Sequence, residues 1–342
     1  MNKNYDIAVF IGRFQLFTEA HKHVIECGLE QANSVLVIIG SSFAPRNLRN
    51  PLREIERSAI ITTSFPKMPI STAYVEDYAY NDEKWISEVQ KCVFEEIYYQ
   101  GLNPHTAKVA LIGHSKDNTS YYLKMFPQWD QIEVENYKGI NATDYRNQYL
   151  NGGAGLVNSF PVTESCKKFL VDFAKTKDYI DLCTEYEFIK NYKKSWEAAP
   201  YAPTFVTVDA ICVQSGHVLV VRRGAAPGRG LWAMPGGFIN VDERIKDAAI
   251  RELREETGIK IPDAVLRGSI VAQDVFDDPN RSLRGRTITH AFLIHLKGNV
   301  NLPKVKGSDD ADKAKWLPIS KLQRKDFYED HYDIIQNMIA RI

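Results

Sequence analysis

Net charge and long apolar runs are both missing from this sequence. Its 342 residues include 43 Lys and Arg and 43 Asp and Glu, so the formal net charge at pH 7 is zero. A chain without excess positive charge lacks the field with which nucleic-acid and membrane-surface binders attract phosphates. No apolar run approaches the ~20 residues that span a bilayer, and no charged-then-apolar leader opens the chain. These absences predict a protein that binds neither nucleic acid nor membrane.

Cysteine is scarce as well, and none of it forms a C-x-x-C pair. The five cysteines are scattered along the chain, at Cys27, Cys92, Cys166, Cys183 and Cys212. An odd number without metal or redox spacing is typical of reduced thiols, so we expect a soluble, cytoplasmic protein. Internal repeats, heptad runs and low-complexity segments are also absent. The length suits two domains, each with a core of its own.

Apolar strands and amphipathic helices alternate through the first third of the chain. The expected strands are residues 5–11, 34–40, 70–75 and 108–113, and the expected helices are residues 19–31, 54–64 and 83–99. This alternation predicts a doubly wound parallel sheet. Ligands of such sheets lie beyond the carboxyl ends of the strands, which Gly12, Gly40 and Gly113 mark here.

The pattern changes around the proline-containing stretch EAAPYAP. Before it we expect helices over residues 144–149, 164–175 and 178–196, and after it strands over residues 205–213, 217–223, 269–276 and 288–296. A short strand after Trp316 and a helix over residues 328–339 complete the pattern. We therefore predict an N-terminal α/β domain of residues 1–185, a helix end and linker over residues 186–203, and a C-terminal α+β domain of residues 204–342.

The most specific chemistry lies in residues 237–259, which read GFINVDERIKDAAIRELREETGI. Helical spacing predicts a helix that begins at Asp242 or a neighbour and ends at Gly258. Three carboxylates, Glu252, Glu255 and Glu256, then share one helix face and repel one another. Mg²⁺ prefers such oxygen ligands and would relieve the repulsion. The alternative is a solvated acidic helix held by ion pairs.

Arg251 and the residues before this helix extend the motif. Arg251 can pair with Glu255 one turn on or reach back to Glu243. The whole spacing resembles the Nudix hydrolase signature, G-x5-E-x7-R-E-U-x-E-E-x-G-U with U aliphatic. Gly236 and Gly237 come before the acidic helix and let the backbone approach a pyrophosphate or a metal ion.

The Nudix resemblance implies pyrophosphate hydrolysis by water that Mg²⁺ activates. The implied metal ligands are Glu252, Glu255 and Glu256, of which Glu255 and Glu256 are also candidate catalytic groups; whether Glu255 is a ligand or a base stays open. The segment 274–292 resembles the corresponding part of Nudix enzymes that cleave ADP-ribose, with a flexible charged loop as the alternative. The implied substrate-binding cations are Arg223 (or Arg222), Arg281 and Arg286.

A second site is indicated in the first half of the chain. GRFQLFTEAH places Gly12, Arg13 and Phe14 at a strand end and His21 on the following helix, where a helix start and a cation can bind an anion. His21 alone would more often be a helix histidine without a ligand. GINATDYR brings Arg146 to another helix start, with Asn141 or Thr143 as the N-cap. SSFAPRNLRNPLREIER adds arginines after the second strand, at Arg46, Arg49, Arg53 and Arg57.

Together these stretches resemble a nucleotidylyltransferase with H-x-G-H and I-S-x-T-x-x-R motifs, and most closely the archaeal-type nicotinamide mononucleotide (NMN) adenylyltransferases. TEAH retains His21 but has Thr18 in place of the first His, and INATDYR retains Thr143 and Arg146. Thr18 cannot carry charge, which leaves its share in phosphate binding open. The resemblance implies further ligand-binding residues at Gly12, Phe14, Arg49, Asn81, Trp85, His114, Lys116 and Asp117. For Trp85 a core position, and for Lys116 a surface charge, are the alternatives.

The implied chemistry needs no protein nucleophile. The NMN phosphate attacks the α-phosphorus of ATP, pyrophosphate leaves with Mg²⁺, and NAD⁺ forms. Arg13, His21, Thr143 and Arg146 would hold the triphosphate, and Arg49 the incoming phosphate. Mg²⁺ is thus expected at both sites, with ATP, NMN and an ADP-ribose-like molecule as small-molecule substrates. A different adenylyl acceptor and a non-catalytic ligand-sensing C-terminal domain are the alternatives; the oligomeric state, including a homo-oligomer, stays open.

Overall fold

The computed structural model describes residues 3–113, 125–297, 301–306 and 311–342. The chain divides into two compact units, residues Met1–Tyr186 and Glu187–Ile342. We call them the first unit and the second unit and describe each by itself. No helix in the described ranges has the length and apolarity to cross a membrane.

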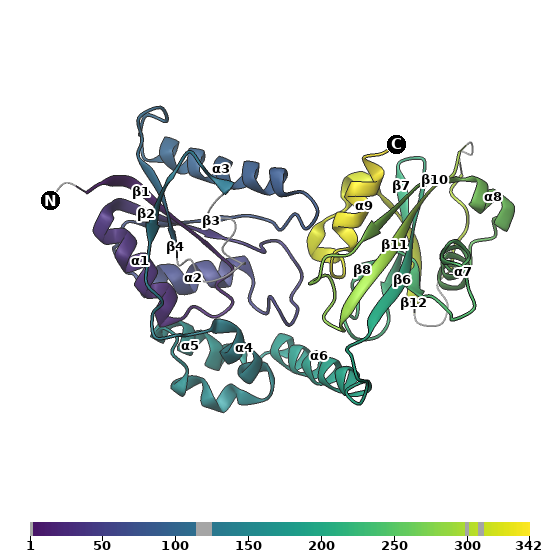
Figure 1. Ribbon diagram of the computed structural model, residues 1–342, viewed down its shortest axis with the longest axis horizontal. Helices are drawn as coiled ribbons and strands as arrows, with labels where there is room; N and C mark the ends of the chain where they lie inside the picture. Colours follow the sequence, from purple (N-terminus) through teal and green to yellow (C-terminus); the bar gives the residue numbers. More distant parts are fainter. Residues whose placement is uncertain (1–2, 114–124, 298–300, 307–310) are drawn as a thin grey trace. The chain divides into compact units, whose positions relative to one another are not determined.

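The first unit is built on a parallel sheet whose strand order is β3-β2-β1-β4-β5 (Figure 1). Its strands are β1 (Tyr5–Gly12), β2 (Ala32–Ile39), β3 (Ile70–Tyr74), β4 (Val109–Gly113) and β5 (Asp130–Glu133). Its helices are α1 (Glu19–Gln31), α2 (Glu54–Ser64), α3 (Asp82–Tyr99), α4 (Ala142–Leu150), the 3-10 helix η2 (Gly153–Ser159), α5 (Glu164–Phe173) and α6 (Lys177–Lys194), within which the unit boundary falls.

Helices cover both faces of this sheet. Val89, Val93 and Ile97 of α3 pack on one face against alternate residues of β1, such as Ile7 and Val9. On the other face α1 approaches closely: a Cβ at Gly28 would lie 3.1 Å from Val35 of β2. Figure 1 shows α1 and α2 on the face opposite α3. The structure therefore confirms the doubly wound sheet, and the strand ends are free to present loops.

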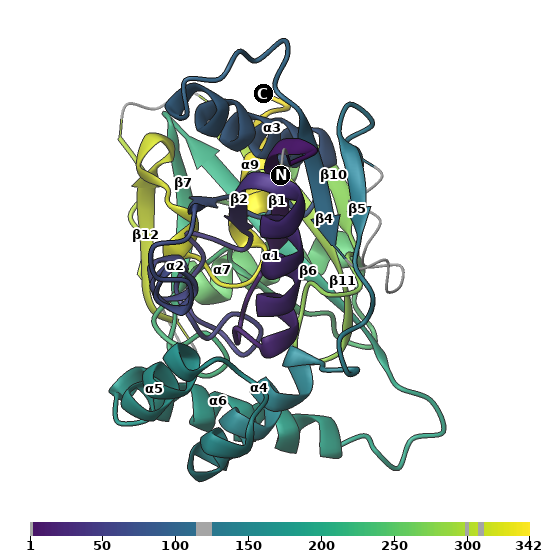
Figure 2. The same ribbon diagram turned by 90° about the vertical axis from the view of Figure 1, so that its left-hand side faces the viewer.

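The short helices that follow the sheet connect back to the start of α1. Figure 2 shows α4 and α5 at the bottom of the view, below α1. The segment between them forms an isolated β-bridge between Thr18 and Val162, and the Glu19 N–H donates to the carbonyl of Pro161. These bonds bring α4 close to the carboxyl end of β1.

The second unit contains a mixed sheet of order β10-β11-β6-β7-β12, with β8 paired to β7 and β9 to β6. Its strands are β6 (Thr204–Gln214), β7 (His217–Arg223), β8 (Trp232–Ala233), β9 (Gly236–Phe238), β10 (Ile270–Phe276), β11 (Arg286–His295) and β12 (Ala311–Pro318). Its helices are α7 (Ile245–Thr257), α8 (Asp263–Gly268), the 3-10 turns η3 (Ile319–Lys321) and η4 (Arg324–Asp326), and α9 (His331–Ile339).

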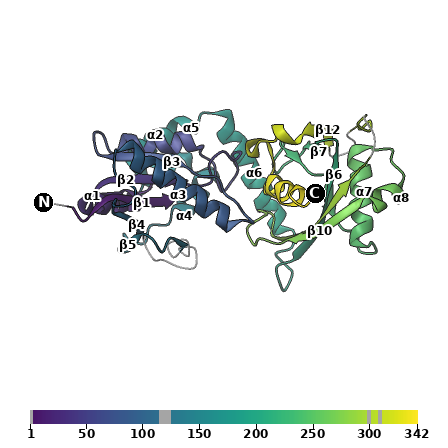
Figure 3. The same cartoon turned by 90° about the horizontal axis from the view of Figure 1, so that it is seen from above.

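Figures 1 and 3 show α7 and α9 on opposite faces of this sheet. Ile250 and Leu253 of α7 pack in a core with Ala210 and Cys212 of β6. The parallel pairing of β6 with β11 runs over ten residue pairs, from Thr204 with Arg286 to Val213 with His295. This long ladder fixes β6, and β6 in turn carries β9 and its glycines.

Several element boundaries differ from the expectations. The acidic helix begins at Ile245 with Arg244 as its N-cap, so Asp242 lies in the preceding turn. It does end at Gly258, whose φ of 60° is the left-handed conformation that glycine favours at a C-cap. The last strand, β12, includes Trp316 instead of following it. The short elements β5, β8, β9 and α8 carry no periodic apolar pattern, and none was expected.

Candidate active sites

The carboxyl end of β1 is shaped by a close contact between a glycine and an aromatic ring. A Cβ at Gly12 would lie 2.8 Å from the ring of Phe14, which occupies the left-handed region with φ of 49°. Phe14 is only 3 % exposed, so its side chain is a packed wedge. Arg13, between them, is exposed. The turn therefore presents Arg13 to solvent beyond the strand end.

Thr18 orients His21 at the start of α1. Thr18 is the N-cap: its Oγ1 accepts the backbone N–H of His21, and its own N–H donates to His21 Nδ1 at 3.1 Å. The ring also stacks on Phe17 at 5.9 Å between centroids. Because Nδ1 accepts a hydrogen bond, the ring carries a proton on Nε2, which can donate to a phosphate oxygen. Thr18 is 1 % exposed, and its hydroxyl is engaged with His21 in the helix cap.

Three arginines gather where α4 meets this strand end. Arg146 is 6 % exposed, and its Nε has no hydrogen-bond partner within the described residues. Burial lowers the pKa of Arg146 to about 10, and the positive charges of Arg13 and Arg49 contribute to the lowering. Cations that depress one another's ionisation form a site for an anion, because an anion would relieve their repulsion.

Two arginines that follow β2, Arg46 in the loop and Arg57 on α2, have structural partners. Arg57 is 1 % exposed and donates to the carbonyls of Arg13 (2.6 Å), Gly40 (2.7 Å) and Ser41 (3.1 Å). One guanidinium thus ties the ends of β1 and β2 together. Among the arginines noted after the second strand, Arg57 therefore has a structural role.

Arg46 is also committed to the fold. It forms an ion pair with Glu56 at 2.6 Å and another with Asp178 at 2.8 Å. Gln15 holds the same loop through hydrogen bonds in both directions with the backbone of Leu52. These contacts fix the path of the loop and so position Arg49.

Only some of the other residues expected to bind a ligand in the first unit lie in the described part of the structure. Asn81 is the N-cap of α3 and accepts the backbone N–H of Lys84 at 3.0 Å. Trp85 is half-buried against the sheet core, 5.9 Å from the ring of Phe126, which favours the core alternative. Thr143 donates its backbone N–H to Asn141, the N-cap of α4. His114, Lys116 and Asp117 lie outside the described residues.

In the second unit, Arg251 organises the acidic face of α7. Its guanidinium donates to both carboxylate oxygens of Glu243 (2.7 and 2.9 Å), to Glu252 (2.8 Å) and to Glu255 (2.8 Å). The predicted pairings with Glu243 and Glu255 are therefore both present. The bidentate bond to Glu243 ties the turn before α7 to the helix.

Glu252 and Glu256, one turn apart, face the glycines of β9. The Gly236 N–H donates to Glu256 at 3.0 Å, and a Cβ at Gly237 would lie 2.6 Å from Glu252 Oε1. A Cβ at Gly236 would lie 2.6 Å from Asp209 Oδ1. Burial raises the pKa of Glu256 to about 8, and the charge of Glu252 contributes to the increase. We call the pair the anionic centre, because a bound cation would hold both desolvated carboxyl groups in their ionised form.

The anionic centre borders a cleft of about 450 Å³. Its wall also includes four arginines, two buried acids and a histidine. These residues are Arg222, Arg223, Arg281 and Arg284, then Asp209 and Glu329, and His331. The cleft therefore combines a site for a cation with groups that can bind an anion.

Comparisons with known proteins agree with this geometry. A NUDIX domain model matches residues 203–338, and a cytidylyltransferase-like model matches residues 9–148. Two solved structures of a bifunctional NMN adenylyltransferase/ADP-ribose pyrophosphatase from Francisella tularensis are 37 % and 36 % identical to this chain. They have TM-scores of 0.89 and 0.88, and in each case the match covers 98 % of this chain and 99 % of that one. The chain belongs to this bifunctional family.

Each unit also has a curated relative of its own. A nicotinamide/nicotinic acid mononucleotide adenylyltransferase from Acinetobacter baylyi is 35 % identical over 185 residues, which is 53 % of this chain and 94 % of that protein. An ADP-ribose pyrophosphatase from Methanocaldococcus jannaschii is 31 % identical over 137 residues, which is 40 % of this chain and 74 % of that protein. We accordingly call the first unit the adenylyltransferase unit and the second the Nudix unit.

Within the Nudix unit, Glu255 does not join the other two carboxylates. Its side chain is 54 % exposed, and it borders a separate surface hollow with Glu243 and Arg254. No group of three or more His, Cys, Asp or Glu side chains in the described ranges is arranged to hold a metal ion. The structure thus places two of the three expected ligands, Glu252 and Glu256, in the cleft and leaves Glu255 outside it.

Of the three arginines between residues 281 and 286, Arg281 and Arg284 line the cleft and Arg286 does not. Arg281 is 8 % exposed and forms a bidentate ion pair with Asp330, at 2.9 and 3.0 Å. Arg286 pairs with Asp277 at 3.1 Å and does not line the cleft. Arg284 lines it, lies 5.2 Å over the ring of Phe238, and has a buried Nε without a partner in the described chain.

Asp209, Glu329 and His331 were missed by the sequence analysis. Asp209 is a lone charged residue in the apolar strand FVTVDAICV, a signal that could have marked it. Its carboxylate accepts the Thr289 hydroxyl at 2.6 Å, and burial raises its pKa to about 6. Glu329 and His331 come from the start of α9, far from the Nudix signature, and only the fold brings them to the cleft.

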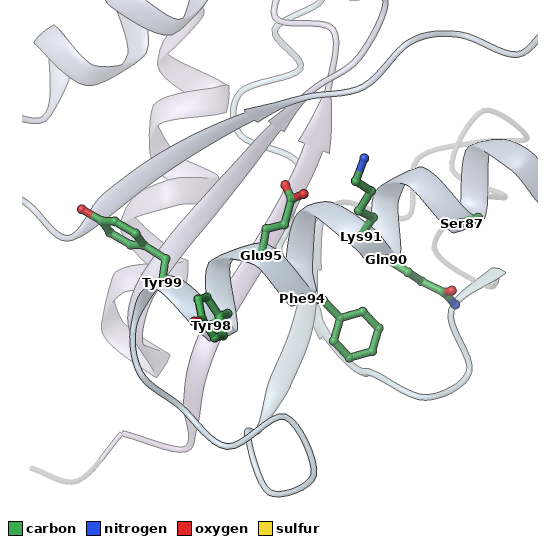
Figure 4. A pocket seen from close by; sticks show the side chains of 7 residues that line it. All are labelled: Ser87, Gln90, Lys91, Phe94, Glu95, Tyr98 and Tyr99. Carbon is green, nitrogen blue, oxygen red and sulfur yellow. The ribbon is translucent and has the colours of Figure 1, made fainter.

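A further hollow lies on the outer surface of α3 (Figure 4). Phe94 is 56 % exposed there, and Tyr98 and Tyr99 are 87 % exposed. Figure 4 shows Phe94 and Tyr98 projecting to the same side of the helix. None of the residues expected to bind substrate lines this hollow, so we do not assign chemistry to it.

Replacing Gly237 tests the close fit at the anionic centre. In Gly237→Ala the new Cβ would force the Glu252 carboxylate to move, because the two would lie 2.6 Å apart. A displacement of this size at a reacting centre costs about 100-fold in rate. We expect pyrophosphatase kcat/KM to fall by that order while adenylyltransferase activity stays unchanged. Equal pyrophosphatase activity in the variant would contradict the placement of Glu252.

Proposed function

We propose that the adenylyltransferase unit transfers AMP from ATP to NMN, giving NAD⁺ and pyrophosphate, and that the Nudix unit hydrolyses ADP-ribose or a related nucleoside diphosphate derivative to AMP and a sugar phosphate. One observation carries the proposal: the two units hold sites of opposite charge. Arg13, Arg49 and Arg146 form a site of mutually repelling cations, whereas Glu252 and Glu256 form a buried anionic one.

In the adenylyltransferase unit, catalysis rests on orientation and charge neutralisation. Arg13, Arg146 and the Nε2–H of His21 would hold the triphosphate, with the α4 N-terminus at Thr143 beside them. Arg49 would hold the phosphate of NMN. Thr18 contributes by fixing the His21 ring through the helix cap. The attacking NMN oxygen replaces pyrophosphate at the α-phosphorus, so no covalent enzyme intermediate is needed.

In the Nudix unit, the donor set fits a hard divalent cation. Glu252 and Glu256 supply two carboxylates, and Mg²⁺ commonly takes one or two carboxylates together with waters and substrate phosphates. When bound, the ion would polarise the pyrophosphate and lower the pKa of a water. Arg251 orients Glu252, and the Gly236 N–H orients Glu256. One of the two Francisella structures contains AMP and a manganese ion, so the choice between Mg²⁺ and Mn²⁺ is part of the proposal.

The domain boundaries and remaining site residues are also proposals. We place the adenylyltransferase domain at residues 1–185, the connection at 186–203 and the Nudix domain at 204–342. Arg223 would contact substrate from its position over the Tyr328 ring, 4.1 Å from the centroid. Arg281 and Arg286 would contribute to substrate binding while paired with Asp330 and Asp277. A cytoplasmic location remains a prediction.

A coupled assay tests the adenylyl acceptor. The purified chain, ATP and Mg²⁺ are incubated with NMN, pantetheine phosphate or riboflavin phosphate in turn, and pyrophosphate release is followed. We expect release with NMN, together with NAD⁺ detected by a dehydrogenase. Release with another acceptor and none with NMN would replace this function. A parallel screen of nucleoside diphosphate derivatives identifies the pyrophosphatase substrate.

A further inference from the structure

His331 opens α9 with one ring nitrogen already occupied. Its side chain is buried, and its Nδ1 accepts the backbone N–H of Met234 at 3.1 Å. Because Nδ1 uses its lone pair in this bond, the neutral ring must carry its proton on Nε2. The fold thus selects one tautomer of His331.

The surroundings of His331 keep the ring neutral. Burial lowers the pKa of His331 well below its ordinary value, and the charges of Arg281, Arg223 and Arg284 contribute to the lowering. Asp209 lies 3.9 Å from Nδ1 and does not reverse the direction of this shift. At neutral pH the residue therefore offers the cleft a neutral N–H donor.

This donor has no acceptor in the described protein. Within the described ranges, the hydrogen bonds and ion contacts of His331 involve only its backbone and Nδ1, and the residue lines the same cleft as Glu252 and Glu256. Arg284 Nε is a buried donor in that cleft without a described partner. Buried donors are normally paired, so a ligand oxygen in the cleft is a suitable acceptor for it.

The two neighbouring arginines, Arg281 and Arg223, already donate hydrogen bonds within the protein. Arg281 gives two hydrogen bonds to Asp330, and Arg223 gives its Nε–H to the carbonyl of Pro227 at 2.8 Å. Arg284 is instead held by its contact with the Phe238 ring and by the nearby Glu329 charge. His331 and Arg284 are therefore the donors best prepared for a ligand oxygen.

We propose that His331, through its Nε2–H, and Arg284 form the donor side of the Nudix cleft and bind oxygens of the nucleoside diphosphate derivative. This inference rests on the proposed pyrophosphatase function. The oxygens can belong to the pyrophosphate or to ribose hydroxyls, since both accept hydrogen bonds. The role is binding and orientation of the substrate, and no proton transfer is assigned to either residue.

A pair of His331 variants separates the two ring nitrogens. His331→Asn keeps an acceptor for the Met234 N–H but removes the distal donor, whereas His331→Gln can place an amide N–H near the lost Nε2. We expect KM for ADP-ribose to rise about fivefold in His331→Asn and less in His331→Gln, because the first variant loses one neutral hydrogen bond. In Arg284→Gln the rise should be roughly 10- to 100-fold, since the lost bond is charge-assisted.

Matched controls come from the same unit. His217 likewise uses its Nδ1 in a bond to the backbone, here as the donor to the Ser215 carbonyl at 2.9 Å, but it lies outside the cleft. Arg267 is paired with Asp247 outside it. His217→Gln and Arg267→Gln should leave KM unchanged. Thermal unfolding of every variant checks that the fold is retained.

Two further readouts decide the outcome. Nitrogen NMR of the His331 ring should show protonation of Nε2. A second substrate, ADP-glucose, separates the oxygen sources: an equal rise in KM for both substrates indicates the pyrophosphate, and a rise for ADP-ribose alone indicates its terminal ribose. A folded His331→Asn and Arg284→Gln with wild-type KM would overturn this inference alone. A wild-type protein that cleaves no nucleoside diphosphate derivative would instead end the proposed function.

Discussion

Glu256→Gln should abolish divalent-metal-dependent hydrolysis and leave NAD⁺ synthesis intact. Glu256 is buried beside Glu252, and the two are the carboxylates of the α7 face that line the cleft. The amide keeps the shape and can still accept the Gly236 N–H, but it removes the charge that attracts the cation. We expect pyrophosphatase activity to fall by more than about 100-fold, since even the partners that support metal ligands cost 10- to 100-fold when removed.

The same variant has an opposite effect on stability. Burial raises the pKa of Glu256 from its ordinary value of 4.5 to about 8, so its favourable contribution is present below pH 4.5 and is lost as pH rises towards 8. Without metal at neutral pH, Glu256→Gln should therefore unfold at the same or a higher temperature than the wild type. Loss of activity with this retained stability shows a chemical defect. Glu255→Gln, outside the cleft, is the matched control and should lose much less activity.

Arg146→Ala should produce the complementary defect. Arg146 is buried near Arg13 and Arg49, and its Nε is available to a phosphate. Removing an arginine that stabilises phosphoryl-transfer charge costs roughly 1,000-fold or more in kcat. We expect NAD⁺ synthesis to fall by that order, while ADP-ribose hydrolysis stays at the wild-type level.

Arg146→Lys separates charge from geometry. A lysine restores the positive charge but not the planar set of donors, so only part of the activity should return. The hydrolysis rate of each variant serves as the internal control for folding and concentration. NAD⁺ synthesis at the wild-type rate in Arg146→Ala would remove the cationic site from the mechanism.

Much of the fold followed from local pattern. The helices α1 and α2 begin and end where their apolar periodicity and polar boundaries indicated, at Glu19–Gln31 and Glu54–Ser64. The short strands β8 and β9 have no comparable pattern, because pairing with β7 and β6 and not local propensity makes them strands. The sequence of one chain does not contain that long-range information in readable form.

Site residues that lie close together in the sequence were predicted, and those that only the fold brings together were missed. Glu252 and Glu256 were predicted to lie together because one helix turn separates them, whereas the position of Glu255 outside the cleft, in its ion pair with Arg251, appears only in the structure. His331 lies far along the chain from the Nudix signature and only the fold brings it to the cleft, so its position in the sequence does not predict a role there. Arg281 and Arg286 were chosen for charge, and their acid partners Asp330 and Asp277 become evident only in the structure.

The Arg57 clamp has a consequence for how defects in this protein would be interpreted. Its guanidinium joins the carbonyls of Arg13, Gly40 and Ser41, so a single substitution there would detach two loops at once. Such a variant would resemble a substrate-binding mutant in kinetic assays although the altered side chain touches no substrate. Conversely, the clamp lets the exposed Arg13 vary in its own contacts without loss of the loop geometry, because Arg57 bonds to its backbone and not to its side chain.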